Sequence, residues 1–461
     1  MSLDAASLIA RQALLTTQQQ IMLSGRNISA AADPTRSRVE GVQVTTWDGS
    51  VRIGQVRRAE DAAIYNAMVR AVSTTAERDA VLAHLDTLSN FMGDTALEMS
   101  PAALIGELEA AVAAYANQPD DPLFGRAVVA TAHDVANALN EVANEINLTR
   151  ERADENIDNA VTRLNDLLVD FHDVNDDVVN ATVRGIDATV HLDKRDALVA
   201  EMNEYLGVTT LVRDNNDMAL FTDGGVTLFD QSARAVEFER TTPFTVATIG
   251  GDLIVDGIPV TSDASPMPSS YGSIVGDAAI RDDIFVTFRL QMDEVARELV
   301  DLFSDGVGSL FTTTGPPDYA GTIAVAADVD PAQGGSVENL RDGTGNPSGY
   351  AAYGDRLQSL LDAFETEQTW DTDAQLGDDR TLNNFAAGSI SWLEGWRKAV
   401  ADDADTQRAI LEGASVALAA ETGVNMDDEY ARQLELERSF AASSRLLAIV
   451  DEMFNNLMSA V

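Results

Sequence analysis

The stretch "LELERSFAASSRLLAIVDEMFNNLMSAV" (residues 434–461) carries a repeated apolar pattern that decides the fold. From Leu436 onward the spacing alternates between four and three residues, with Ser443 filling one position. Such a heptad repeat predicts a helix with one continuous apolar stripe. The members of the stripe are Leu436, Phe440, Leu447, Val450, Phe454, Leu457 and Val461. Because chain ends fray unless something packs against them, this stripe needs a partner surface.

Residues 1–30 offer a second helix with the same property. Two columns of apolar residues recur every seven positions: Leu8, Leu15 and Met22 in one, and Leu14, Ile21 and Ile28 in the other. Between them lie Thr, Gln and Ser, so this helix depends on packing for its stability. The two terminal helices therefore either pair within one chain, as an ordinary two-helix core would, or each packs against neighbouring chains.

The chain between the terminal helices alternates between helical and strand periodicity. Helical patterns cover residues 58–92, 101–117, 122–180 (one helix or two in tandem), 191–207, 283–304 and 353 to the end, with breaks at 371–379 and 422–428. Alternating apolar residues predict a short hairpin or an extended segment at 39–57, and a small β unit at about 207–262. Residues 263–275 are typical of a loop, as are 314–350 apart from one short strand candidate, "TIAVAAD" (322–328). We expect a mainly α, elongated protein: a helical-bundle body with a small β-hairpin-rich unit, flanked by long terminal helices.

Composition excludes several classes of partner. The chain has 31 basic and 75 acidic residues, and a net charge of -44 disfavours binding to nucleic acid or to an anionic membrane. There is no cysteine, so disulfides and thiolate metal sites are excluded. The first residues, "MSLDAASLIARQALL", lack a basic segment followed by an apolar core, so we expect no cleavable secretory signal.

No residue pattern indicates catalysis. The four histidines, His84, His133, His172 and His191, stand singly and form no metal-ligand spacing. The Gly-rich "RDGTGNPSG" (341–349) lacks the Lys-Ser/Thr of a phosphate loop, and "DVNDDVV" (173–179) lacks the Gly of a calcium loop. We therefore predict no enzyme activity, no cofactor and no metal.

Two terminal motifs resemble those of the bacterial flagellar axial proteins. In "RNISAAADPTRSR" (26–38), Asn27, Ile28, Pro34, Ser37 and Arg38 match the motif that follows the first helix of that family, although Thr35 and Arg36 replace its usual glycine and aromatic residue. The segment "TGVNMDDEYARQLELERSFAASSRLLAIVDEMFNNLM" (422–458) is more specific. It resembles the family's C-terminal motif through Val424, Asn425, Asp427, Glu429 and Tyr430, with Met426 where leucine is common.

Two internal stretches narrow the resemblance to the hook-associated protein 1 family of axial proteins. These are "HLDKRDALVAEMNEYLGVTTLVRDNNDMALFTDGGVTLFD" (191–230) and "QPDDPLFGRAVVATAHDVANALN" (118–140). Many relatives carry an additional β-rich outer domain where this chain has only the loop-rich stretch 314–350, so we expect that domain to be vestigial or absent. The alternatives that remain are a hook or rod component, or a cytoplasmic coiled-coil adaptor.

The resemblance implies a structural protein of the hook–filament junction. It would form a ring of about eleven subunits, contacting hook protein on one side and a second junction protein and flagellin on the other. It would be exported through the flagellar type III channel, with a cytoplasmic chaperone holding its C-terminal helix. Residues 1–35 and 425–461 would form a paired-helix inner-tube domain that is disordered or mobile before assembly, and 36–424 the body. The expected assembly residues are Leu14, Ile21, Ile28, Leu436, Phe440, Leu447, Val450, Phe454 and Leu457.

Overall fold

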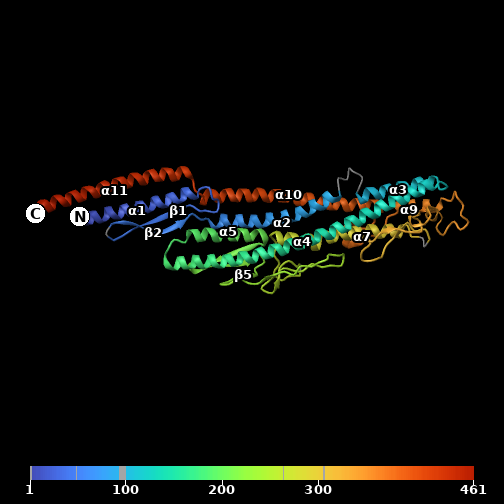
Figure 1. Ribbon diagram of the computed structural model, residues 1–461, viewed down its shortest axis with the longest axis horizontal. Helices are drawn as coiled ribbons and strands as arrows, with labels where there is room; N and C mark the ends of the chain where they lie inside the picture. The colour runs from blue at the N-terminus through green and yellow to red at the C-terminus, as the bar shows by residue number, and fades with distance from the viewer. Residues whose placement is uncertain (1–2, 48, 93–99, 263, 305–306, 461) are drawn as a thin grey trace.

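The molecule is an elongated array of helices with both chain ends at the same extremity (Figure 1). The computed structural model describes residues 3–47, 49–92, 100–262, 264–304 and 307–460. Long α-helices make up most of these residues and the strands are short. The predicted mainly α, elongated fold is therefore confirmed.

The helices of the described residues follow the predicted order, and their bounds are as follows. They are α1 (Leu3–Ala30), α2 (Ala62–Met92), α3 (Pro101–Asn117), α4 (Pro122–Arg184), α5 (Thr189–Tyr205), α6 (Ser273–Ala279), α7 (Phe285–Leu302), α8 (Val337–Asp342), α9 (Asp355–Phe364), α10 (Leu382–Thr422) and α11 (Met426–Ala460). A π turn at Ile280–Ile284 joins α6 to α7.

The strands form small antiparallel sheets. They are β1 (Val39–Thr45), β2 (Val51–Arg58), β3 (Val208–Val212), β4 (Met218–Thr222), β5 (Thr227–Phe229), β6 (Val236–Glu237), β7 (Ile254–Val255), β8 (Ile258–Pro259), β9 (Phe311–Thr312) and β10 (Ala324–Val325). β1 pairs with β2 as the predicted hairpin, and β3–β4–β5 and β6–β7–β8 form the β unit expected between 207 and 262.

Helix α4 is the backbone of the body. Its 63 residues span about 95 Å at 1.5 Å per residue, so the stretch predicted as one helix or two is a single helix. Asp121 caps its start by accepting a hydrogen bond from the Leu123 N–H, and Pro122 occupies the first turn. It ends at Gly185, whose φ of 68° lies in the left-handed region that favours glycine.

The two halves of α4 support two hydrophobic cores. The first half packs with α2, α3 and α7 in a core that also includes residues of α9 and α10, and Leu139 and Phe288 are among its members. The second half packs with α5 and the β unit around residues such as Leu164, Phe171 and Phe229. Because one uninterrupted helix runs through both cores, the body is continuous along its length (Figure 1).

Buried arginines attach the β unit to α4. The Arg281 guanidinium donates to Asp154 Oδ1 at 2.6 Å and to the Gly251 carbonyl at 2.8 Å. Arg150 donates to the Thr248 carbonyl at 2.8 Å. These charges lie away from water, so each needs such partners to remain there without a large desolvation cost.

Two local predictions differ from the structure. The loop predicted over 263–275 ends early, because α6 begins at Ser273 and continues through the π turn into α7, ahead of the predicted start at 283. Within 314–350 the predicted strand is present as β10, but α8 was missed. A six-residue helix is too short for periodicity to reveal it, and it forms here because Leu340 is fully buried in the first core.

Candidate assembly surface

Helices α1 and α11 lie side by side and extend beyond the body (Figure 1). The β1–β2 hairpin packs along α1, where the Thr16 hydroxyl donates to the Val51 carbonyl at 2.6 Å. The predicted assembly residues lie on these two helices. Leu14, Ile21, Ile28, Leu436 and Leu447 are half-buried.

The apolar stripe of α11 is only partly covered by α1. Val450 is buried with 4% of its surface exposed, whereas Phe440 is 40% exposed and Phe454 is 36% exposed. Leu457 lies within α11, but its side chain is outside the described residues. The pair also leaves further large apolar side chains in contact with solvent: Leu8, Leu15, Met22, Leu434, Leu446, Ile449, Met453 and Met458. Exposed apolar patches on folded proteins are typical of surfaces that bind another protein, a membrane or a ligand.

A buried polar cluster locks the inner ends of the two helices together. The Asn27 side chain donates to Glu429 Oε1 at 2.7 Å, and Ser24 donates to Glu429 Oε2 at 2.7 Å. Asn27 also exchanges hydrogen bonds with the backbone of Val39 at 3.0 and 2.9 Å. We call Ser24, Asn27, Val39 and Glu429 the terminal clasp. It joins α1, α11 and the first strand of the hairpin at one point.

The clasp is consistent with the chemistry of buried carboxylates. Glu429 is 3% exposed and Asn27 is 2% exposed, and in the described part of the chain no cation pairs with Glu429. Its two oxygens are instead satisfied by neutral donors on α1, which lowers the cost of burying the charge. Removing either donor would leave one oxygen of the buried carboxylate without its partner.

Asn425 begins α11 next to the clasp. Its side-chain oxygen accepts a hydrogen bond from the Asp427 N–H at 3.0 Å, as an N-cap residue does. The exposed carboxylate of Asp427 lies in the first turn, where the helix dipole favours negative charge. Nearby, the Arg38 N–H donates to the Thr422 carbonyl at 2.7 Å, so the two connections to the body run together.

The remaining motif residues lie around this point in different environments. Pro34 and Tyr430 are exposed, and Val424 is half-buried. Ser37 donates its backbone N–H to Asp193 at 3.3 Å, and the Arg38 side chain lies 3.4 Å from Glu40. The structure thus brings Asn27, Asn425 and Glu429 together and leaves Pro34, Asp427 and Tyr430 facing solvent.

Residues that the sequence analysis did not select connect the clasp to the body. Arg26 on α1 pairs with Asp187 at 2.6 Å, and Arg58 at the end of β2 pairs with Asp196 at 2.6 Å and Asp193 at 3.2 Å. Burial acts to lower the pKa of Arg58, but Asp196 and Asp193 outweigh it and raise that pKa. The "HLDKRD" segment (191–196) was noted only for its resemblance, and its two aspartates were the available signal.

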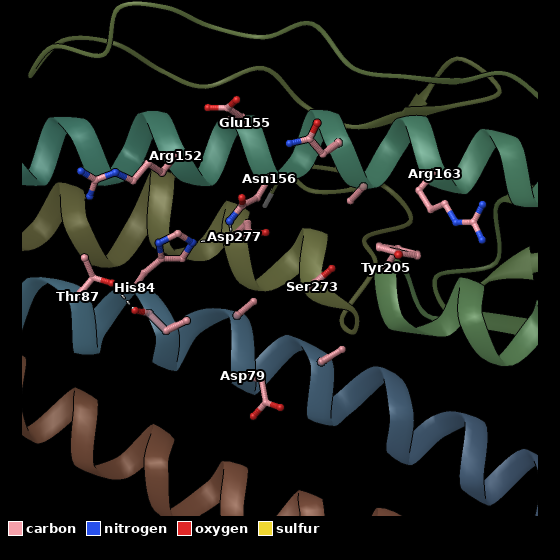
Figure 2. A pocket seen from close by; sticks show the side chains of 15 residues that line it. Asp79, His84, Thr87, Arg152, Glu155, Asn156, Arg163, Tyr205, Ser273 and Asp277 are labelled. Carbon is pink, nitrogen blue, oxygen red and sulfur yellow. Dashed lines mark hydrogen bonds and ion pairs between the residues drawn. The ribbon is translucent and has the colours of Figure 1, made fainter.

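A groove in the body, lined by α2, α4, α5 and α6, contains one of the histidines (Figure 2). His84 on α2 lies 2.7 Å from Asp277 Oδ1 on α6, and Asn156 on α4 reaches the same oxygen at 3.4 Å. The contact joins three helices, so His84 has a structural partner inside the body. Among the described residues, no group of three or more His, Asp or Glu side chains is arranged to hold a metal ion. Nor is any helix there long and apolar enough to cross a membrane.

Comparison with known proteins identifies the family. A search of curated proteins finds no match. Among solved structures, "The structure of the flagellar hook junction protein FlgK from Burkholderia pseudomallei" is similar, with 18% identity, a TM-score of 0.43 and coverage of 55% of this chain. The present chain spans 47% of the length of that protein.

Two family models match the sequence. The model described as the flagellar basal body rod FlgEFG protein C-terminal domain matches residues 420–460, which include the whole of α11. The model described as the flagellar hook-associated protein FlgK helical domain matches residues 76–309, from within α2 to the end of α7 and slightly beyond. The FlgK helical-domain model covers just over half of this chain. The chain therefore belongs to the family of flagellar hook-associated proteins FlgK.

Proposed function

We propose that this protein is a structural subunit of the bacterial flagellum that forms the hook–filament junction and is required for filament assembly. It is located outside the cell, on the flagellum, in a ring of about eleven copies. Its neighbours are hook protein on one side, and a second junction protein and flagellin on the other. Membership of the hook-associated family supports this proposal.

The observation that carries the proposal is the half-covered pair of terminal helices. Residues 1–35 and 425–461 would be the inner-tube domain, and 36–424 the body with its β unit and the remnant at 314–350. Phe440 and Phe454 remain exposed on α11 even with α1 in place. Packing several copies around an axis would bury these faces, and the gain is about 25 cal/mol per Å² of apolar surface removed from water.

The same exposed face gives a reason for a chaperone. Before assembly, the α11 stripe would be an aggregation hazard in the cytoplasm. A dedicated export chaperone that covers the C-terminal helix would remove that hazard and leave the terminal helices unpaired for passage through the type III channel. Export would then need no cleavable signal.

Electron microscopy of cells lacking the gene tests the proposal. We expect bare hooks, with flagellin released into the medium, and restoration of filaments by the wild-type gene. Normal filaments in the deletion strain would contradict the proposal.

The match of residues 420–460 to the rod-protein C-terminal domain favours one alternative, a rod or hook subunit. The same experiment separates the two, since loss of a rod or hook subunit removes the hook as well. A cytoplasmic adaptor would leave both structures intact and would stay inside the cell.

A further inference from the structure

The start of α5 lies beside the inner end of α1 and the root of the hairpin (Figure 1). Three carboxylates there hold segments that lead to the terminal helices. Asp187 pairs with Arg26 of α1 at 2.6 Å. Asp193 and Asp196 both pair with Arg58 at the end of β2, at 3.2 and 2.6 Å. We call Asp187, Asp193 and Asp196 the α5 anchor.

The connector between α1 and β1, residues 31–38, reaches the same anchor. The Ser37 N–H donates to Asp193 Oδ2 at 3.3 Å, and the Arg36 guanidinium lies 4.0 Å from that oxygen. The anchor therefore contacts the end of α1, the connector and the end of the hairpin in turn.

The contact with Arg58 is the buried part of the anchor. The side chain of Arg58 is 10% exposed and that of Asp193 is 3% exposed, whereas the side chains of Arg26 and Asp187 are 32% and 33% exposed. Ion pairs in contact with water contribute little, but removing one partner of a buried pair leaves a charge without compensation. We therefore expect Arg58 and Asp193 to determine how firmly the anchor holds.

The charge of the attached segment complements the anchor. Residues 26–58 contain six arginines and three acidic residues, whereas the whole chain has 31 basic and 75 acidic residues. A locally basic segment is attracted to a group of carboxylates, and that attraction favours one orientation of the segment over others. The joint between the terminal helices and the body is thus enriched in arginine.

Residues 37–39 connect the anchor to the terminal clasp. Ser37 is held on the anchor, and the backbone of Val39 exchanges hydrogen bonds with Asn27 of the clasp. One residue, Arg38, separates these two contacts, and its carbonyl accepts the Ala59 N–H at 2.7 Å where the hairpin ends. With a single residue between them, neither contact can move far without moving the other.

We propose that the α5 anchor fixes the direction of the terminal helices relative to the body, and that it is coupled to the terminal clasp through residues 37–39. With α11 in place, Glu429 holds Asn27, and Asn27 in turn holds Val39 next to the anchor. A protein that draws α11 away from α1 removes the first of these contacts and thereby loosens α1 and the hairpin on α5. The inference concerns a single copy of the chain, so it is independent of the proposed function.

Spin-label distances in the full-length protein test the anchor. The chain has no cysteine of its own, so Gln43→Cys on β1 with Asp170→Cys on α4 introduces one exposed label site on each side of the joint. Double electron–electron resonance should give one narrow distance distribution in this background, and Arg58→Ala should replace it with a broad one. The matched control is Arg57→Ala, because Arg57 is the exposed neighbour on the same strand and its side chain bonds to Gln55. It should keep the narrow distribution.

Asp193→Asn guards against a folding defect in Arg58→Ala, because it removes the charge and keeps the shape of the side chain. It should broaden the distribution as well, with the circular dichroism melting of the body unchanged. A broad distribution before any anchor residue is changed, or a narrow one in Asp193→Asn, would overturn the inference.

Hydrogen exchange tests the coupling, which must act equally in both directions. Glu429→Ala changes α11 alone, yet it should broaden the distance between the labels on β1 and α4. In return, Asp193→Asn should raise the opening equilibrium at the start of α11 about fivefold or more, the size of a typical coupling. Glu204→Gln, an exposed carboxylate at the far end of α5, should leave that exchange unchanged. Independent effects of the two variants would overturn the coupling. Faster exchange throughout the body in Asp193→Asn, α3 included, would show that the anchor belongs to the core and is not a joint.

Discussion

Helix α4 and the α1–α11 pair both carry apolar residues at helical spacing, but their surroundings differ. On α4, Leu139, Leu164 and Phe171 are fully buried by other parts of the same chain. On α11, Val450 is the one apolar stripe residue buried among those whose side chains are described, while Phe440 and Phe454 face solvent. A periodic apolar stripe therefore shows that a helix needs a partner, and burial shows whether the chain supplies that partner itself.

The contrast extends to what holds each region together. The body is stabilised by two large apolar cores. The inner ends of the terminal helices are joined by a polar cluster in which Glu429 accepts from Ser24 and Asn27. We therefore expect the body to unfold in one cooperative transition. We expect the terminal helices to separate from each other at a lower free energy than that transition requires.

The largest expected effect is in the core of the body. Phe171→Ala removes a fully buried ring that packs edge-on against Phe229, with the two ring centroids 5.0 Å apart. We expect it to reduce the free energy of unfolding by about 3–5 kcal/mol, because it deletes apolar contacts and leaves a cavity. Chemical denaturation followed by circular dichroism measures this. Val169→Ala, exposed on the same helix, is the control, and equal losses in both variants would show that the α4 core is not as packed as described.

The next effect concerns pH. Burial raises the pKa of Asp293 on α7 to about 6, although Arg289 and the Ala320 N–H act to lower it. The unfolded chain releases this proton near pH 3.9, so between about pH 4 and 6 the folded protein retains a proton that the unfolded chain has lost. The protonated Asp293 therefore contributes its full stabilisation below about pH 4. As pH rises from 4 to 6 this contribution is lost, and the free energy of unfolding falls by about 3 kcal/mol.

Asp293→Asn removes this titration and keeps an oxygen that can accept the Ala320 N–H bond of 2.7 Å. The difference in unfolding free energy between wild type and variant should therefore change across the window. Asp362→Asn, on the exposed side of α9, serves as the control. A difference that is independent of pH from 4 to 6 would contradict the assignment to Asp293.

A smaller and local effect is expected at the terminal clasp. Asn27→Ala leaves Glu429 short of a donor and the backbone of Val39 unpaired, at a cost of about 1–3 kcal/mol. We expect faster amide hydrogen exchange and proteolysis at the start of α11, with the melting temperature of the body unchanged. Asn455→Ala, exposed on α11, should change neither. Loss of the body transition in Asn27→Ala would mean that the pair and the body unfold together.

The helices and strands that depend on local chemistry could be predicted from the sequence. The helix predicted over 101–117 is α3, and its start depends on local chemistry: the Ser100 side chain accepts a hydrogen bond from the Ala103 N–H, and Pro101 occupies the first turn. The clasp was not predictable in this way, because Asn27 and Glu429 are separated by 402 positions and no periodicity relates them. Both were selected only through the resemblance of the terminal motifs, which located the residues without indicating that they touch.

The smallest expected effect on folding is also the sharpest test of the comparison. Phe454 lies on α11 with 36% of its surface exposed, one turn beyond Val450, which is 4% exposed. Phe454→Asp should leave the melting of the isolated protein unchanged, because no folded core surrounds the side chain. It should nevertheless prevent incorporation into flagella, since packed copies would bury an unpaired charge. Val450→Asp should instead open the terminal pair already in the monomer, as measured by hydrogen exchange in α1. If Phe454→Asp assembles normally, the exposed stripe of α11 is not a contact between subunits, and the terminal helices form an ordinary pair whose only partners are each other.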